Sequence, residues 1–175
     1  QIWHSCAEAL DLASKKNIFH KDLHPRNILI TDENKPVIID FGISILEHTI
    51  SKRPAENEFS NKFSAPELIQ KNENQIVART DMYSLAICIL YSCLGHRLFY
   101  EDENNESRLQ KIVDLYRRHV SSEGIEAFQN VFRKSFDLDP DKRYFRYSEL
   151  RDVLNQLFDL INHTPEKPFA LSIRQ

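Results

Sequence analysis

The chain has 175 residues, which is an ordinary length for a single domain. Apolar residues make up 41% of the sequence, enough for a core, and charged residues make up 28%, which is typical of a soluble surface. The formal net charge is −3, so the chain has no overall basic field, and we expect neither nucleic acid nor an anionic membrane as its partner.

The first third of the chain predicts one helix followed by a small hairpin. Residues 2–16 place apolar side chains at helical spacing, which is typical of an amphipathic helix. Residues 18–27, named here the polar loop, hold a proline and several polar side chains and predict irregular backbone. Two short β-branched runs, residues 28–30 and 36–40, are separated by the polar stretch TDENK and predict a β-hairpin.

The middle of the chain predicts a long loop and then a buried helix. Residues 43–64 show no period and many polar groups, so we expect a loop there. Residues 80–95 are apolar nearly all round, which indicates a helix at the centre of the domain, with Thr80 as its N-cap and Gly95 as its C-terminal stop. The longest apolar run, residues 85–94, is far too short to span a bilayer.

The last part of the chain predicts three more helices. They cover residues 107–119, 124–136 and 147–161, and residues 162–175 form a tail that contains two prolines. The low glycine count of 3 also favours helices over turn-rich sheets. The sequence therefore predicts one mostly α-helical domain with a single hairpin near its N-terminal end.

Three cysteines, Cys6, Cys88 and Cys93, give an odd count without the paired spacing of a metal motif. We expect buried free thiols in a reducing compartment rather than a disulfide or a metal site. The N-terminus shows no signal peptide, so we expect a cytoplasmic protein, and an effector delivered into a host cell stays open as an alternative.

Five short motifs follow one another along the chain. HKDLHPRN at residues 20–27 fits the pattern H-R-D-x-x-x-x-N apart from its lysine, DFG at 40–42 comes directly after a predicted strand, and APE follows at 65–67. TDMYSLA at 80–86 and DPDKR at 139–143 complete the series. Each motif alone is weak, but together and in this order they resemble the C-terminal lobe of the eukaryotic-type protein kinase family.

The resemblance covers roughly residues 1–161 and implies a mainly α fold. We expect a kinase C-terminal lobe spanning residues 1–175, built as a helical bundle around a buried central helix, with a small β-hairpin at the catalytic loop. The family's Gly-rich loop and ATP-binding lysine belong to a smaller N-terminal lobe that has no counterpart in this sequence. We therefore expect the chain to be one lobe of a longer polypeptide, to have that N-terminal lobe as a partner, and to bind ATP only weakly alone.

By the same resemblance, five residues carry the chemistry, with ATP and Mg²⁺ as cofactors and a protein hydroxyl as substrate. Asp22 orients the substrate hydroxyl or accepts its proton, and Asn27 and Asp40 hold Mg²⁺. Carboxylate and amide oxygens are ligands that suit this hard cation. Leu29 lies against the adenine, and His24 stands where serine/threonine kinases commonly carry a lysine that contacts the transferring phosphate.

The residues give mixed indications of whether the substrate hydroxyl belongs to Ser/Thr or to Tyr. Arg26 lies where tyrosine kinases often carry arginine, whereas Ser60 stands where serine/threonine kinases usually have threonine, and we expect Ser/Thr rather than Tyr. Residues 43–64 correspond to the activation loop, and Lys21 replaces the arginine that usually grips a phosphate on that loop.

Two other functions are open alternatives. A pseudokinase would bind partners through the same fold, but it would need none of Asp22, Asn27 and Asp40. A small-molecule phosphotransferase of the aminoglycoside type would share the first motifs, but such enzymes generally lack APE and the later D-P-x-x-R element.

Two further pairs of residues have more than one interpretation. His20 and His24 are spaced like zinc ligands, but the residue after His20 is a lysine and the following proline opposes a helix, so we expect no zinc there. Glu67 and Arg143 could be surface charges, but the family pairs them in a buried salt bridge, and we expect that pair here.

Overall fold

The computed structural model describes residues 2–41, 59–70, 77–100, 104–117 and 120–162. Helix α1 spans Ile2–Ser14 and buries Cys6, Ala7 and Leu10, which lie three and four positions apart on one face. It packs against α5, α8 and strand β2. The helix ends in the turn that leads to the polar loop, where Asn17 takes the left-handed backbone with φ of 57°.

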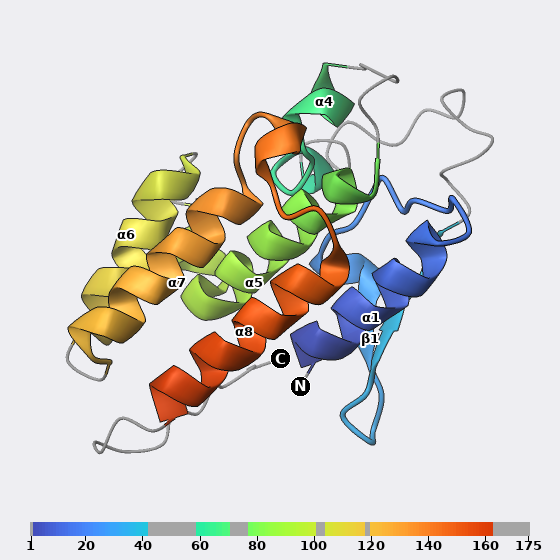
Figure 1. Ribbon diagram of the computed structural model, residues 1–175. Helices are drawn as coiled ribbons and strands as arrows, with labels where there is room; N and C mark the ends of the chain where they lie inside the picture. The colour runs from blue at the N-terminus through green and yellow to red at the C-terminus, as the bar shows by residue number, and fades with distance from the viewer. Residues whose placement is uncertain (1, 42–58, 71–76, 101–103, 118–119, 163–175) are drawn as a thin grey trace.

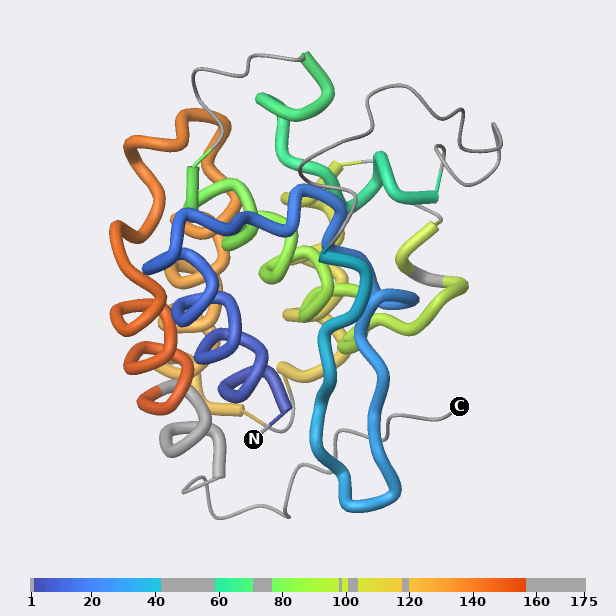
Figure 2. Tube along the Cα trace, turned by 90° about the vertical axis from the view of Figure 1, so that its right-hand side faces the viewer, coloured from blue at the N-terminus to red at the C-terminus, as the bar shows by residue number. Residues whose placement is uncertain are grey.

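The predicted hairpin is confirmed, with β1 at Ile28–Ile30 and β2 at Pro36–Ile38. The strands are antiparallel, and Leu29 lies opposite Val37. The polar loop before β1 is irregular, as predicted, apart from the single 3-10 turn η1 at Pro25–Asn27. Figure 2 shows the hairpin beside α1, and the polar loop connects the end of α1 to the first strand of the hairpin.

Helix α5, Ala78–Tyr100, is the predicted buried helix and runs through the middle of the bundle (Figure 1). The predicted N-cap was wrong. The Thr80 side chain instead reaches back and accepts a hydrogen bond from the Val77 N–H at 3.1 Å, so the helix begins two residues earlier. Gly95 interrupts the helix as predicted, because its φ of 72° is a conformation that glycine alone adopts without strain.

The remaining helices surround α5. Helix α4 is short, Pro66–Ile69; α6 spans Asn105–Tyr116, α7 Ser122–Ser135 and α8 Tyr147–Asn162, with the 3-10 turn η3 at Pro140–Lys142 between the last two. Helices α6 and α7 pack on α5, and α8 packs on α1 and α7. The mainly α prediction is therefore confirmed.

The predicted loop at residues 43–64 is only partly within the described residues. Residues 59–61 form one helical turn, which the absence of a hydrophobic period did not predict. The turn is held by the burial of Phe63 and Ser60, at 0% and 7% exposure. Of the hydroxyls in this segment, Ser44, Thr49 and Ser51 lie outside the described residues.

The core is centred on α5. The three cysteine thiols lie in or beside this core. Cys6 and Cys88 are fully buried, Cys93 is half-buried, and all three are free thiols, as predicted. Burial raises the pKa of Cys6 and of Cys93 to about 12, which keeps them protonated at neutral pH. Among the described residues, no helix is both long enough and apolar enough to cross a membrane.

Candidate active site

The polar loop is anchored to the core by one buried carboxylate. The backbone N–H groups of His20 and Lys21 donate hydrogen bonds to Asp81 at 2.7 and 2.8 Å. Asp81 lies in the first turn of α5 and is 1% exposed. Burial raises the pKa of this carboxyl, and the two hydrogen bonds work in the opposite direction. An acidic residue at the start of an otherwise apolar stretch could have indicated such a role for Asp81. The sequence could not indicate which backbone groups bind it.

His20 connects the polar loop to the end of β2. Its Nε2 lies 2.8 Å from the Ile39 carbonyl oxygen, and its Nδ1 accepts a hydrogen bond from the Asp22 N–H at 3.3 Å. A carbonyl can only accept, so these two bonds require the neutral tautomer that carries its proton on Nε2. The ring also packs on Phe41 with centroids 4.9 Å apart.

Asp22 and His24 of the polar loop lie side by side, and both side chains are largely buried. The Asp22 Oδ2 atom is 3.8 Å from His24 Nε2, and both side chains are 11% exposed. The His24 ring packs edge-on against Phe59 with centroids 5.4 Å apart, so its Nε2 end faces the carboxylate. Phe59 was not predicted to contribute to the site, because it lies in the segment expected to be a loop.

The backbone of Asn27 pairs with Ile39, the residue between β2 and Asp40. The Asn27 amide donates from Nδ2 to the Asp22 carbonyl at 2.9 Å, and the Ile39 N–H donates to the Asn27 carbonyl at 3.0 Å. Asp40 follows directly and is exposed, with φ of 62°. Lys21 has φ of 64°, so two non-glycine residues of this site hold the unfavourable left-handed conformation.

This arrangement fits a nucleotide-bound Mg²⁺ ion. With Nδ2 committed to Asp22, the Asn27 amide has its acceptor Oδ1 as the remaining group, and Asp40 offers an exposed carboxylate. Mg²⁺ in such sites takes one or two protein ligands, with phosphate oxygens and water completing the octahedron. In the described part of the chain, no three or more His, Cys, Asp or Glu side chains form a group that could hold a metal ion.

An apolar platform lies on the hairpin next to these polar groups. Leu29, the predicted adenine contact, is 51% exposed, and its cross-strand neighbour Val37 is 44% exposed. Residues directly opposite in an antiparallel pair share one face, so together they present a flat apolar surface. Val37 was not predicted as part of the site. Its pairing with Leu29 follows from a turn of five residues between the two strands.

The buried pair beneath the site is present as predicted. Arg143 donates to both carboxylate oxygens of Glu67, at 2.7 and 2.9 Å, and the two side chains are 0% and 1% exposed. The guanidinium also donates to the Asp137 carbonyl at 2.7 Å and lies over the Tyr83 ring. The pair thereby ties η3 to α4 and α5.

Comparison with known proteins agrees with this geometry. Residues 1–163 match the family described as "Protein kinase domain". The chain belongs to the protein kinase family. A probable serine/threonine-protein kinase, mkcD, from Dictyostelium discoideum is 30% identical over 144 residues, covering 78% of this chain and 21% of the relative. The serine/threonine-protein kinase PknB of Mycobacterium leprae is 29% identical over 185 residues, covering 98% of this chain and 28% of the relative.

Solved kinase structures share the fold. The crystal structure of a double mutant of the Mycobacterium tuberculosis PknI kinase domain has a TM-score of 0.59 at 21% identity, covering 89% of this chain and 52% of that chain. The described fold is therefore that of a kinase C-terminal lobe. The matched part of this chain spans 21% and 28% of the lengths of the two curated kinases named above.

Proposed function

We propose that the protein containing this chain is an ATP-dependent protein kinase that phosphorylates serine or threonine. The observation that carries the proposal is the pair of hydrogen bonds at Asn27, one from its amide to the Asp22 carbonyl and one to its carbonyl from the N–H of Ile39, the residue directly before Asp40. Retaining all three residues in one rigid arrangement is what phosphoryl transfer requires. The serine/threonine assignment is supported by the names of the relatives and by Ser60.

The residues divide the reaction between them. The Asp22 carboxylate accepts a hydrogen bond from the substrate hydroxyl and takes its proton as the oxygen attacks the γ-phosphorus. A new phosphorus–oxygen bond forms, and the bond between the γ-phosphorus and the bridging oxygen breaks, releasing ADP. Bound Mg²⁺ would supply charge neutralisation on the phosphates, and Asn27 and Asp40 would hold it in register with Asp22.

The nucleotide base is proposed to lie on the hairpin. The platform of Leu29 and Val37 offers the apolar surface that an aromatic base buries on binding. A platform contacts one face of the base only. We propose that an N-terminal lobe of the full-length protein covers the other face and supplies the lysine that grips the phosphates.

The test uses the full-length protein with ATP, Mg²⁺ and a mixed protein substrate, followed by phosphoamino-acid analysis. Asp22→Ala is expected to lower the transfer rate by about 10²–10⁴-fold, the usual contribution of a positioned acid–base group, with ATP binding kept. The matched control Asp32→Ala removes an exposed carboxylate from the hairpin turn. Transfer that survives Asp22→Ala at the control's rate contradicts this mechanism, and phosphotyrosine as the main product contradicts the serine/threonine assignment.

A further inference from the structure

The ring of Phe59 contacts two residues of the polar loop. The Arg26 guanidinium lies over the face of the ring, 3.9 Å from its centroid. The His24 imidazole meets the ring at an interplanar angle of 90°, with the two centroids 5.4 Å apart. Both contacts are favourable, because the face of an aromatic ring attracts a cation and two rings prefer perpendicular or offset arrangements. Phe59 thus contacts the residues directly before and directly after Pro25.

The two contacted residues belong to the turn that leads to Asn27. The Asn27 N–H donates to the His24 carbonyl at 2.9 Å, which closes the 3-10 turn η1. A 3-10 turn of three residues has few hydrogen bonds of its own, and their geometry is poorer than in an α-helix. Packing of the Phe59 ring on His24 and Arg26 therefore restricts where the turn places these two side chains.

The Phe59 ring is itself held by the core. It lies on Phe63 and on Tyr100, with centroids 5.2 and 6.3 Å apart. Phe63 is fully buried and stacks on Phe99 of α5, with centroids 5.2 Å apart and an interplanar angle of 12°. A ring that rests on a close-packed core can fix a neighbouring group, because such a core deforms little. The polar loop is thereby packed against α5 through Phe63 and Phe59.

The His24 imidazole contacts these rings and also the proposed catalytic carboxylate. Its centroid lies 5.4 Å from that of Phe59 and 6.5 Å from that of Phe63, and its Nε2 is 3.8 Å from Asp22 Oδ2. His24 is buried, so the imidazole can take another rotamer only if a neighbouring side chain moves. A smaller side chain in place of Phe59 gives the imidazole that room and changes its distance from Asp22.

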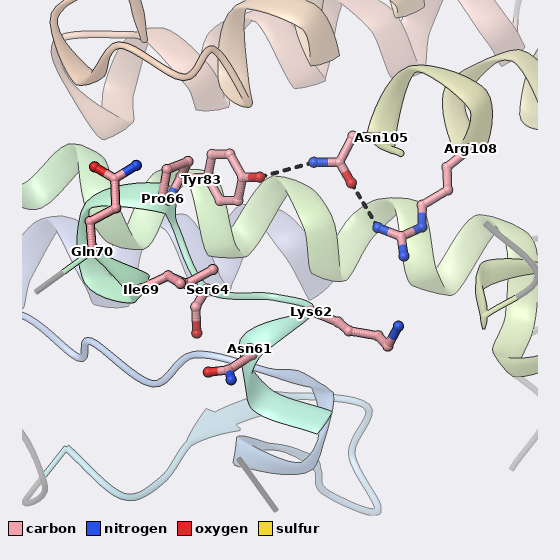
Figure 3. A pocket seen from close by; sticks show the side chains of 9 residues that line it. All are labelled: Asn61, Lys62, Ser64, Pro66, Ile69, Gln70, Tyr83, Asn105 and Arg108. Atoms are coloured by element: carbon pink, nitrogen blue, oxygen red, sulfur yellow. Dashed lines mark hydrogen bonds between the residues drawn. The ribbon is translucent and has the colours of Figure 1, made fainter. Parts of the chain in front are cut away.

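The contacts of Phe59 are separate from the pocket that borders the same segment. This pocket of about 490 Å³ lies between the segment before α4 and helices α4, α5 and α6 (Figure 3). Figure 3 shows Asn61 and Ser64 among the lining side chains, whereas Phe59 and its two polar-loop partners are not among the described residues that line it. A substitution of Phe59 therefore tests the polar loop rather than this pocket.

We propose that Phe59 is a positioning residue for phosphoryl transfer, whose ring holds the His24 imidazole at the Asp22 carboxylate. This inference rests on the proposed kinase function and adds a residue to it. The position of His24 matters because its Nε2 lies 3.8 Å from the carboxylate that accepts the hydroxyl proton, so a shift of the imidazole changes the surroundings of that carboxylate. A misplacement of about 1 Å at such a site can cost about 10²-fold in rate.

The test is a double-mutant cycle in the full-length protein, with kcat and the KM for ATP measured on a protein substrate. The variants are Phe59→Leu, His24→Gln and the two together, and Phe59→Tyr is the conservative variant that keeps the ring. The control Phe128→Leu truncates a half-buried ring of α7 that packs on Phe132 with centroids 4.5 Å apart. Thermal unfolding checks that each variant is folded, and Phe59→Met, which keeps most of the volume but no ring, replaces Phe59→Leu if the latter does not fold.

Phe59→Leu is expected to lower kcat by about tenfold with a smaller change in the KM for ATP, and Phe59→Tyr is expected to keep most of the natural rate. When His24→Gln is already present, Phe59→Leu is expected to change kcat by less than about twofold, because the group that Phe59 positions is gone. An equal loss of kcat with and without His24→Gln overturns the inference and leaves the kinase function intact, as does a kcat of Phe59→Leu equal to that of Phe128→Leu. Absence of transfer by the natural protein refutes the kinase function itself, and with it any role of Phe59 in transfer.

Discussion

The guanidinium of Arg143 forms two parallel hydrogen bonds with the carboxylate of Glu67, and both side chains are sealed from solvent. Two further N–H groups of the guanidinium donate to the carbonyls of Asp137 and Arg79. Such a pair adds little net stability over an apolar replacement, but removing one member leaves an uncompensated charge. The pair is therefore best tested by breaking it.

Arg143→Ala is expected to lower the free energy of unfolding by about 3–5 kcal/mol, because the Glu67 carboxylate is left buried and unpaired. Urea unfolding at pH 7 measures the change. The control Arg117→Ala removes an exposed partner of Asp114 and is expected to cost at most about 1 kcal/mol. Equal unfolding midpoints for the two variants would show that the Glu67 pair is not buried in solution.

The pair of Glu67 and Arg143 also predicts how the stability of the fold depends on pH. Burial by itself raises the pKa of Glu67, but hydrogen bonds from Arg143 and its positive charge outweigh that effect, and the pKa lies below its usual value. A carboxyl with a lowered pKa in the folded state stabilises the protein above its unfolded pKa, and this stabilisation is lost as the pH falls through the folded pKa.

Glu67→Gln is therefore expected to be clearly less stable than the natural protein at pH 7, with the difference shrinking below a pH of about 4. Urea unfolding at pH 7, 5 and 3.5 measures it. The control Glu33→Gln changes an exposed carboxyl of the hairpin turn and is expected to leave the profile unchanged. A difference between Glu67→Gln and the natural protein that stays constant from pH 7 to 3.5 would contradict this linkage.

The anchoring of the polar loop by Asp81 gives a third prediction. In Asp81→Asn, one carboxylate oxygen becomes an NH₂ group that cannot accept from the Lys21 or the His20 N–H. A buried unsatisfied donor costs about 1–3 kcal/mol. The loop also loses a contact that holds Lys21 at its positive φ, so we expect kcat to fall by at least tenfold.

If Asp81 only stabilised the fold, Asp81→Asn would not change kcat and the KM for ATP to different extents. We expect that KM to change less than kcat, because Asp81 acts on the polar loop that carries Asp22 rather than on the nucleotide platform. The control Asp152→Asn alters an exposed carboxyl of α8. Unchanged kcat in folded Asp81→Asn would refute the positioning role.

Much of the helical framework could be predicted from the sequence, because burial of one face imposes a local period. The apolar positions of α1 and α8 recur near every 3.6 residues, and those helices were predicted within about two residues of their bounds. The start of α5 was mispredicted because threonine is common at N-caps, whereas Thr80 lies inside the helix and its hydroxyl accepts a hydrogen bond from the Val77 N–H. The amino-acid type alone does not separate these two positions.

The contacts that build the site could not be predicted, because they join distant segments. The bonds from His20 and Lys21 to Asp81 cross 61 and 60 residues of sequence. The stacking of Phe63 on Phe99 joins a segment without any period to the far end of α5. The family resemblance implied roles for residues of the polar loop, but it did not predict the ring contacts that Phe63 makes with Phe59 and Phe99.

The last prediction concerns His24, which replaces a common lysine of the family. Its Nε2 lies 3.8 Å from the Asp22 carboxylate. By the resemblance, the side chain at this position contacts the phosphoryl group in transfer. An ordinary imidazole loses its charge near pH 6.5, whereas a lysine stays charged to above pH 9. Loss of that charge removes stabilisation of the developing negative charge, so turnover is expected to fall as pH rises from 6 to 8.

His24→Lys is expected to flatten this pH profile and to exceed the natural rate above pH 8, and His24→Gln is expected to be slow at every pH because it is never charged. Turnover of the full-length enzyme from pH 6 to 9 measures both variants, and thermal unfolding checks that each is folded. The Gln variant also serves as the control for packing, since the His24 ring lies against Phe59. If both variants keep the natural profile and rate, His24 only packs, and another group supplies the charge at the phosphate.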